Sequence, residues 1–209
     1  MLLSDIMSGS SFSERVQAIA RETRNKLGIN VPVYQLGVVV PDVVKAAAEL
    51  EGSGMKPFLL MAGAPRFWKE RGSDGAIKSR IGFGYHRGIE IELLEPGTGS
   101  DFYRRSLEKQ GRPIVQHLGF LVSDVDAWAK KLTDAGYPVY VRGRLGAGPL
   151  SIDFAYMDTE QEAGLILEFI CHRLFGIRFR PPVGFQQFLG RIEIKTGKQI
   201  GRASCRERV

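Results

Sequence analysis

The alternation of apolar and polar residues along this chain repeats once, at an interval of 82 positions. Residues 33–54 and residues 115–136 each begin with a strand-like stretch rich in Val and Leu, and continue with apolar residues at helical spacing. Nine of the 22 aligned pairs are identical, where chance would give roughly one or two. The pattern therefore predicts two copies of one strand–helix unit, produced by an internal duplication.

Further strand-like segments follow the helix in each copy. They are predicted over 57–62, 76–86 and 89–95 in the first copy, and over 138–142, 151–157 and 164–170 in the second. Residues 63–75 are predicted as a loop, and a Gly-rich turn is expected after residue 142. We therefore expect an α+β protein in which one domain, residues 33–172, contains two βαβββ modules over 33–97 and 115–172.

Additional segments flank and join these modules. An N-terminal helical extension over 1–30 is predicted to contain an amphipathic helix at 11–27, and a connector helix is predicted over about 100–110. Residues 173–198 are predicted to form a C-terminal extension that wraps the core. The last eleven residues, 199–209, resemble the translated read-through of a sequencing adapter, so they are left out of the fold prediction.

Composition and charge narrow the class of protein. The apolar fraction of 44% and the charged fraction of 25% are ordinary for a globular chain, and no signal peptide or membrane span is apparent, which favours the cytoplasm. The net charge of +6 is concentrated near the C-terminus. Residues 1–170 contain 20 Lys+Arg and 21 Asp+Glu, whereas residues 171–209 contain 9 and 2. The modules thus lack the basic excess of a nucleic-acid-binding face.

Side chains that can bind a metal ion recur on one face of the predicted strands. Gln35 and His117 occupy equivalent positions in the two copies, and Glu92 and Glu168 lie in the last strand of each module. A half-exposed sheet would explain isolated polar residues, but apolar residues share these faces, and buried carboxylates cost several kcal/mol unless compensated. A divalent cation would compensate both carboxylates. Glu90 is a rival to Glu92, because it shares the same face two residues away.

The chain resembles the vicinal oxygen chelate superfamily, which includes glyoxalase I and methylmalonyl-CoA epimerase. The resemblance rests on the strings YQLGVVVPD (34–42), IELLEP (91–96), QHLGFLVSDVD (116–126), FAYMDT (154–159) and LILEF (165–169). It implies that the modules pair into a cup-shaped mixed sheet whose floor binds one divalent ion, Mg, Mn, Co, Ni or Zn, through Gln35, Glu92, His117 and Glu168. Only one His falls in this set, which argues against an iron-dependent extradiol dioxygenase.

The same resemblance implies a reaction class. We expect a metal-dependent epimerase or isomerase, similar to methylmalonyl-CoA epimerase, in which Glu168 removes a proton next to a carbonyl and Glu92 serves the opposite face. The alternatives are a glyoxalase I-type lyase and a non-catalytic small-molecule binding module. The expected substrate is a small molecule, an acyl-CoA thioester or 2-oxo compound. Arg142 and Arg144 either bind its carboxylate or phosphate or are simply solvated. A homodimer, with no nucleic-acid or membrane partner, is expected.

Overall fold

The computed structural model describes Leu3 and residues 12–55, 58–108, 112–182 and 184–185. Residues 186–209, which include half of the predicted C-terminal extension and the whole adapter-like segment 199–209, lie outside the described residues. So does most of the N-terminal extension before residue 12. Within the described part, none of the helices is long and apolar enough to cross a membrane.

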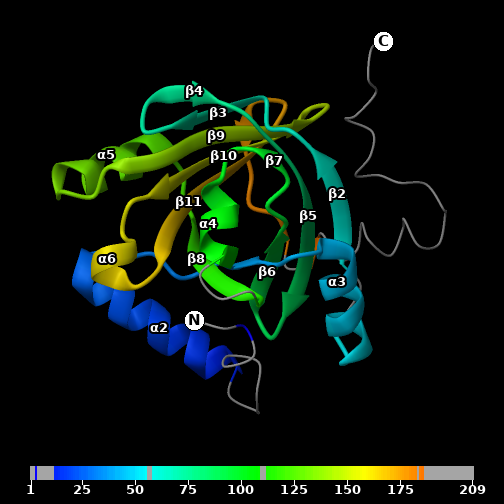
Figure 1. Ribbon diagram of the computed structural model, residues 1–209. Helices are drawn as coiled ribbons and strands as arrows, with labels where there is room; N and C mark the ends of the chain where they lie inside the picture. Colours follow the sequence, from blue (N-terminus) through cyan, green and yellow to red (C-terminus); the bar gives the residue numbers. More distant parts are fainter. Residues whose placement is uncertain (1–2, 4–11, 56–57, 109–111, 183, 186–209) are drawn as a thin grey trace, which may run out of the picture.

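A strongly curled sheet forms the body of the molecule (Figure 1). The first module supplies β1 (Gln35–Val39), β2 (Leu59–Gly63), β5 (Ile77–His86) and β6 (Ile89–Leu94), and the second supplies β8 (Ile114–Leu121), β9 (Val139–Ala147), β10 (Leu150–Met157) and β11 (Ile166–Leu174). With β3 (Phe67–Glu70) and β4 (Ser73–Gly75), the strand order is β2-β5-β6-β1-β8-β11-β10-β9-β3-β4. Short β7 (Thr98–Gly99) and β12 (Ile177–Arg178) pair with β5 and β11.

The two modules have matching internal pairings. In each module the first strand lies parallel to the last one, β1 to β6 and β8 to β11, and the antiparallel pair β1–β8 joins the modules. This arrangement confirms the predicted α+β cup of two βαβββ units. Because β1 and β8 are the duplicated strands, the pairing places equivalent residues of the two copies next to each other at the centre of the sheet.

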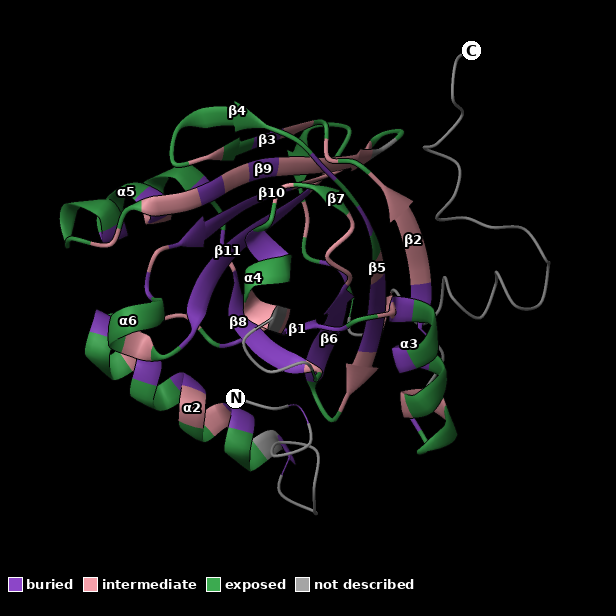
Figure 2. Ribbon diagram, in the orientation of Figure 1, coloured by how far each residue is buried: buried purple, intermediate pink, exposed green. Residues whose placement is uncertain are grey.

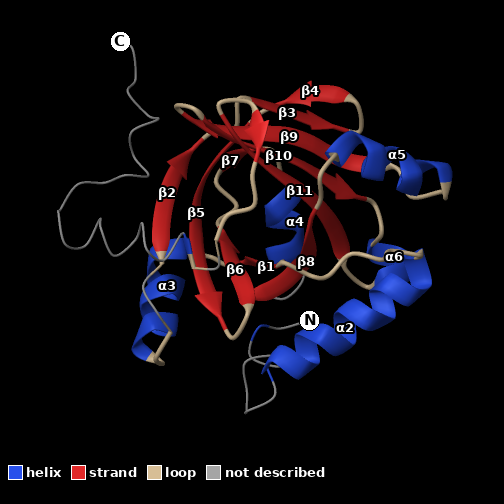
Figure 3. Ribbon diagram, turned by 180° about the vertical axis from the view of Figure 1, so that it is seen from behind, coloured by secondary structure: helices blue, strands red, loops and turns tan. Residues whose placement is uncertain are grey.

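Helices α2 (Phe12–Leu27), α3 (Val43–Gly52), α5 (Val125–Asp134) and α6 (Glu160–Ala163) lie on the convex side of the curl (Figures 1 and 3). The equivalent helices α3 and α5 begin at equivalent caps. The Asp42 side chain accepts a hydrogen bond from the amide of Lys45, and Asp124 accepts from those of Asp126 and Ala127. Each such cap contributes about 1 kcal/mol and fixes where the chain turns from strand to helix.

The buried apolar residues form two layers, one on each face of the sheet. The outer layer joins the convex face to the helices and contains Leu36, Leu118 and Phe169, whereas the inner layer fills part of the cup and contains Val39 and Ile166. The central strands are buried along their length (Figure 2). Since successive strand residues point to opposite faces, polar residues on the inner face are enclosed as fully as the apolar ones.

The structure corrects the sequence prediction in two segments. The predicted loop at 63–75 contains the β3–β4 hairpin, whose first strand pairs with β9 of the other module. Strand β9 continues through the expected Gly-rich turn to Ala147, because Gly143 and Gly146 pair within the sheet with β10. The predicted connector helix is present as α4 (Phe102–Glu108), and it lies within the curl (Figure 3), where Phe102 and Tyr103 join the inner layer.

Candidate metal centre

Four neighbouring strands at the centre of the sheet each direct one of the predicted metal ligands into the cup. In the order β6-β1-β8-β11 these are Glu92, Gln35, His117 and Glu168. All four are buried, with exposed fractions of 5%, 3%, 0% and 4%. The fold therefore brings together the side chains that the sequence predicted as metal ligands, although they come from segments up to 133 positions apart.

The ligand atoms of Glu92, His117 and Glu168 lie within 4.8 Å of one another. Nε2 of His117 is 3.2 Å from Oε2 of Glu92 and 3.2 Å from Oε2 of Glu168. These three atoms, together with Oε1 of Gln35, are buried and have no hydrogen-bond partner among the described residues. Unsatisfied buried oxygens and nitrogens are costly, so this group of atoms fits a bound cation.

Two glycines provide the space for this cluster. Gly37 on β1 lies opposite His117 on β8, and Gly119 on β8 lies opposite Gln35 on β1. A Cβ added to Gly37 would lie 1.9 Å from the His117 ring, and one added to Gly119 would lie 2.8 Å from Oε1 of Gln35. Any other residue at either position would displace a predicted ligand.

A hydrogen bond behind His117 orients its ring. Nδ1 of His117 lies 3.3 Å from Oε1 of Gln116, and Nε2 of Gln116 donates to Oγ of Ser106 and to the carbonyl of Phe102. Because the amide nitrogen of Gln116 is already used as a donor, its oxygen accepts from Nδ1 of the imidazole. This tautomer leaves the lone pair of Nε2 directed at the cluster, as a metal ligand requires.

Glu90 supports the cluster without being part of it. Its Oε1 accepts a hydrogen bond of 2.9 Å from Nε2 of Gln35, and its Oε2 accepts one of 3.1 Å from the Tyr34 hydroxyl. The first contact turns Oε1 of Gln35 toward the site. The strand register also distinguishes the two glutamates. Glu92 lies opposite Gly37 in the first module, and Glu168 lies opposite the equivalent Gly119 in the second. Glu90 lies opposite Gln35, and the residue at its equivalent position in the second module is Ile166.

Burial and mutual contact shift the pKa values of these groups. Burial raises the pKa of Glu90 to about 8 and that of Glu92 to about 7. For His117, burial alone would lower the pKa, but Glu168 and Glu92 outweigh it and raise the pKa to about 9. The metal-free cluster thus retains protons at neutral pH, and a bound cation would have to displace them.

Aromatic side chains close one side of the site. Tyr156 of β10 packs edge-on against the His117 ring, with 5.0 Å between the ring centroids, and its hydroxyl lies 3.2 Å from that of Tyr103 on α4. Trp68 of β3 packs against Tyr103 and is 3% exposed. No local sequence signal predicts this wall, because it depends on the connector helix α4 entering the curl.

The opposite side of the site opens into an apolar cavity. The small chamber around the cluster, lined by Gln35, Glu92 and Glu168, adjoins a larger one of about 850 Å³ including its open mouth. The two chambers share Ile81, Phe83, Leu145, Ile152, His172 and Gly63 in their walls. The route to the cluster therefore passes between β2, β5 and β10.

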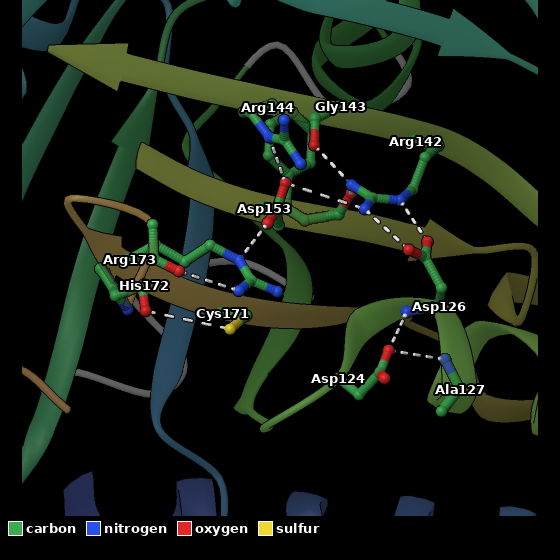
Figure 4. Close-up of polar contacts among 12 residues, drawn as sticks. Asp124, Asp126, Ala127, Arg142, Gly143, Arg144, Asp153, Cys171, His172 and Arg173 are labelled. Atoms are coloured by element: carbon green, nitrogen blue, oxygen red, sulfur yellow. Dashed lines mark hydrogen bonds and ion pairs between the residues drawn. The ribbon is translucent and has the colours of Figure 1, made fainter. Parts of the chain in front are cut away.

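Arg142 and Arg144 lie on the convex face, away from this route. Both contact Asp153, which also accepts a hydrogen bond of 2.9 Å from Arg173, and Arg142 contacts Asp126 of α5 at 2.8 Å (Figure 4). Neither arginine lines the chambers described above. The structure thus separates them from the cluster, and their proposed contact with substrate stays a prediction that this geometry does not support.

Comparison with known proteins supports the fold. The profile of the glyoxalase/bleomycin resistance protein/dioxygenase superfamily matches residues 34–156. That range covers more than half of the 209 residues, and the chain belongs to this superfamily. No curated protein matches it.

Several solved structures have a similar fold at low sequence identity. A hypothetical protein from Bacillus halodurans is 16% identical, with a TM-score of 0.48, over 68% of this chain and 94% of that one. Methylmalonyl-CoA epimerase from Mycobacterium tuberculosis is 19% identical, with a TM-score of 0.44, over 66% and 85%. A mutant of 4-hydroxymandelate synthase from Streptomyces coelicolor is 15% identical, with a TM-score of 0.48, over 79% and 55%. Similarity at this level carries no information on substrate.

Proposed function

We propose that this protein is a metal-dependent enzyme that removes a proton from a carbon next to a carbonyl, and that it acts as an epimerase or isomerase. The observation that carries the proposal is a group of four buried ligand atoms, from Gln35, Glu92, His117 and Glu168, that have no hydrogen-bond partner among the described residues and lie beside a cavity. Three oxygens and one nitrogen form a donor set that suits Mg, Mn, Co, Ni or Zn.

The chain's own residues would provide the acid–base chemistry. A divalent cation at this site supplies a Lewis acid, which lowers the cost of negative charge on a carbonyl oxygen. Glu168 is the proposed base, and Glu92 is the second candidate. Their Oε2 atoms each lie 3.2 Å from Nε2 of His117, so two carboxylates border one small chamber. Epimerisation requires proton removal on one face and return on the other, and such a pair is suited to it.

Metal analysis tests the first half of this proposal. Wild-type protein titrated with Co²⁺ or Zn²⁺ should bind one ion per chain, His117→Ala should bind none tightly, and His86→Ala should behave as wild type. His86 is a suitable control because it lies at the far end of β5, where its ring packs against Phe12. If the wild-type protein binds no divalent ion in this titration, the proposal is wrong.

Deuterium exchange tests the second half. The metal-loaded protein is incubated in D₂O with a panel of acyl thioesters and 2-oxo compounds, and mass spectrometry measures deuterium incorporation next to the carbonyl. Incorporation that disappears with a chelator and in Glu168→Gln supports proton abstraction. A conversion of thiol adducts of 2-oxo aldehydes into thioesters would instead indicate a glyoxalase I-type lyase. If the protein binds these compounds equally well with and without a chelator and no deuterium is incorporated, it is a non-catalytic binding module.

A further inference from the structure

The larger chamber beside the metal centre is lined mainly by apolar side chains. Its wall comes from β2, β5, the β9–β10 hairpin and the segment after β12, and includes Leu59, Met61, Ile81, Phe83, Leu150 and Ile152. None of the described residues that line it is Asp, Glu, Lys or Arg. A charged group entering this chamber would lose its hydration without gaining a partner, at a cost of several kcal/mol.

Residues after the duplicated modules complete this chamber. Phe179, Pro181 and Phe185 line it from one side, and the chain is held there by a hydrogen bond of 3.1 Å from the amide of Phe179 to the carbonyl of His172. The Phe179 ring packs edge-on against the His172 ring, with centroids 5.9 Å apart. The C-terminal segment, to which the sequence assigned no chemistry, thus forms part of the wall next to the metal centre.

His172 marks the junction between the two chambers. It lies on β11 four residues after Glu168, so both side chains point into the cup. Its ring is 4% exposed, and Nδ1 has no hydrogen-bond partner among the described residues. Burial lowers its pKa to about 4, so at neutral pH it is an uncharged imidazole. Among the described residues that line both chambers, His172 is therefore the one hydrogen-bonding side chain, and none is charged.

We infer that the substrate of the proposed enzyme carries an uncharged, mainly apolar substituent, which occupies the chamber lined by Met61, Phe83 and Phe179 while its carbonyl group reaches the metal centre. This inference rests on the proposed function and narrows it. Because none of the described residues that line the chamber is cationic, it offers no partner to the phosphates of a coenzyme or to a carboxylate on the substituent. Substrates with a linear alkyl or aromatic group fit its composition.

Alkyl hydroxamates test this inference by binding alone, because their head group chelates metals through two oxygens. Calorimetry on the Co²⁺-loaded protein compares acetohydroxamate, butanohydroxamate, hexanohydroxamate and octanohydroxamate. We expect affinity to rise by roughly fourfold for each methylene that becomes fully buried. Hexanohydroxamate should bind at least tenfold more tightly than an analogue of equal length that ends in a carboxylate. Equal affinity along the series, or preference for the carboxylate, would overturn the inference.

A pair of variants at one position locates the effect. Met61 is half-buried on β2 and lines the larger chamber but not the smaller one. Met61→Glu should weaken octanohydroxamate at least tenfold and leave acetohydroxamate unchanged, whereas Met61→Leu should bind both as wild type does. If Met61→Glu and Met61→Leu bind octanohydroxamate with equal affinity, the alkyl chain does not occupy this chamber.

The same series separates failure of the inference from failure of the proposed function. If acetohydroxamate binds the Co²⁺-loaded protein and chain length has no effect, the metal centre stands and the apolar chamber does not receive the substituent. If no Co²⁺ is retained, the proposed function fails, and the chamber is then tested by titrating metal-free protein with 1-octanol and 1-propanol. Tighter binding of 1-octanol would show that the chamber accepts apolar chains even without a metal.

Discussion

Gly37 and His117 face each other across the pair β1–β8, and the imidazole occupies the space where a side chain of residue 37 would stand. The position equivalent to Gly37 in the second module is Gly119, which leaves the corresponding space to Gln35. The duplicated Leu-Gly pair of the sequence is thus a structural requirement of the site: each copy's glycine makes room for the other copy's ligand.

Gly37→Ala should therefore damage metal binding while leaving the fold largely intact. The added methyl would lie 1.9 Å from Cε1 and Nε2 of His117, so the ring must move out of the cluster. We expect a loss of metal affinity of at least tenfold, measured by competition with a chelator. Gly52→Ala is a matched control, because a Cβ at Gly52 has no atom within 4 Å. Equal metal affinity in both variants would contradict this account.

Gln116→Leu should weaken metal binding by roughly 10- to 100-fold, the range found for residues that orient a metal-ligating His. The substitution leaves the Nδ1–H of His117 without its acceptor and allows the other tautomer, in which Nε2 carries the proton. The measurement is the Kd for Co²⁺, with the visible spectrum reporting any change in coordination. Ser106→Ala removes one of the two acceptors of the Gln116 amide nitrogen and leaves the carbonyl of Phe102 as the other, so this variant should remain within a few-fold of wild type.

Asp153→Ala should destabilise the fold without changing metal content. The Asp153 carboxylate is 3% exposed and joins Arg144 and Arg173 on neighbouring strands. Its removal leaves these guanidinium groups without their shared acceptor, at a cost of roughly 1–3 kcal/mol in the free energy of unfolding. Chemical denaturation measures this loss. Asp126→Ala, whose carboxylate is 77% exposed, should cost less than about 1 kcal/mol.

His172 should make stability depend on pH below neutrality. Its pKa is lowered by burial from 6.5 to about 4, so between these values the unfolded chain binds a proton that the folded chain does not. The free energy of unfolding is then highest above pH 6.5 and falls as the pH decreases toward 4, by an amount on the order of 3 kcal/mol.

His172→Phe keeps an aromatic ring at this position and removes the titrating group. The difference in unfolding free energy between wild type and His172→Phe, measured by denaturation from pH 4 to 8, isolates the contribution of this residue from that of other groups. We expect the difference to change by about 3 kcal/mol across this range, in the direction of a relatively more stable variant at low pH. A constant difference would show that the imidazole is not buried as described.

Much of the fold could be predicted from the sequence, because strand alternation and helix caps are local or periodic patterns of residues. The alternation of residues in β1, β6, β8 and β11 correctly assigned their inner and outer faces, and the caps at Asp42 and Asp124 correctly marked two helix starts. The segment around Trp68 was wrongly predicted as a loop, because β3 is stabilised by pairing with β9, more than 70 positions away. Local propensity cannot report such a partner.

The sequence by itself determined the duplicated modules and the residue types of the candidate metal centre, since strand periodicity fixes which side chains share a face. It could not choose between Glu90 and Glu92, which share a face; the register of β6 against β1 places Glu92 beside His117 and leaves Glu90 to hold Gln35. Tertiary structure alone decided that Arg142 and Arg144 lie outside the cup, and that α4 and Phe179 line its interior. These features depend on contacts between segments distant in sequence, and the packing of the whole chain determines which of those segments meet.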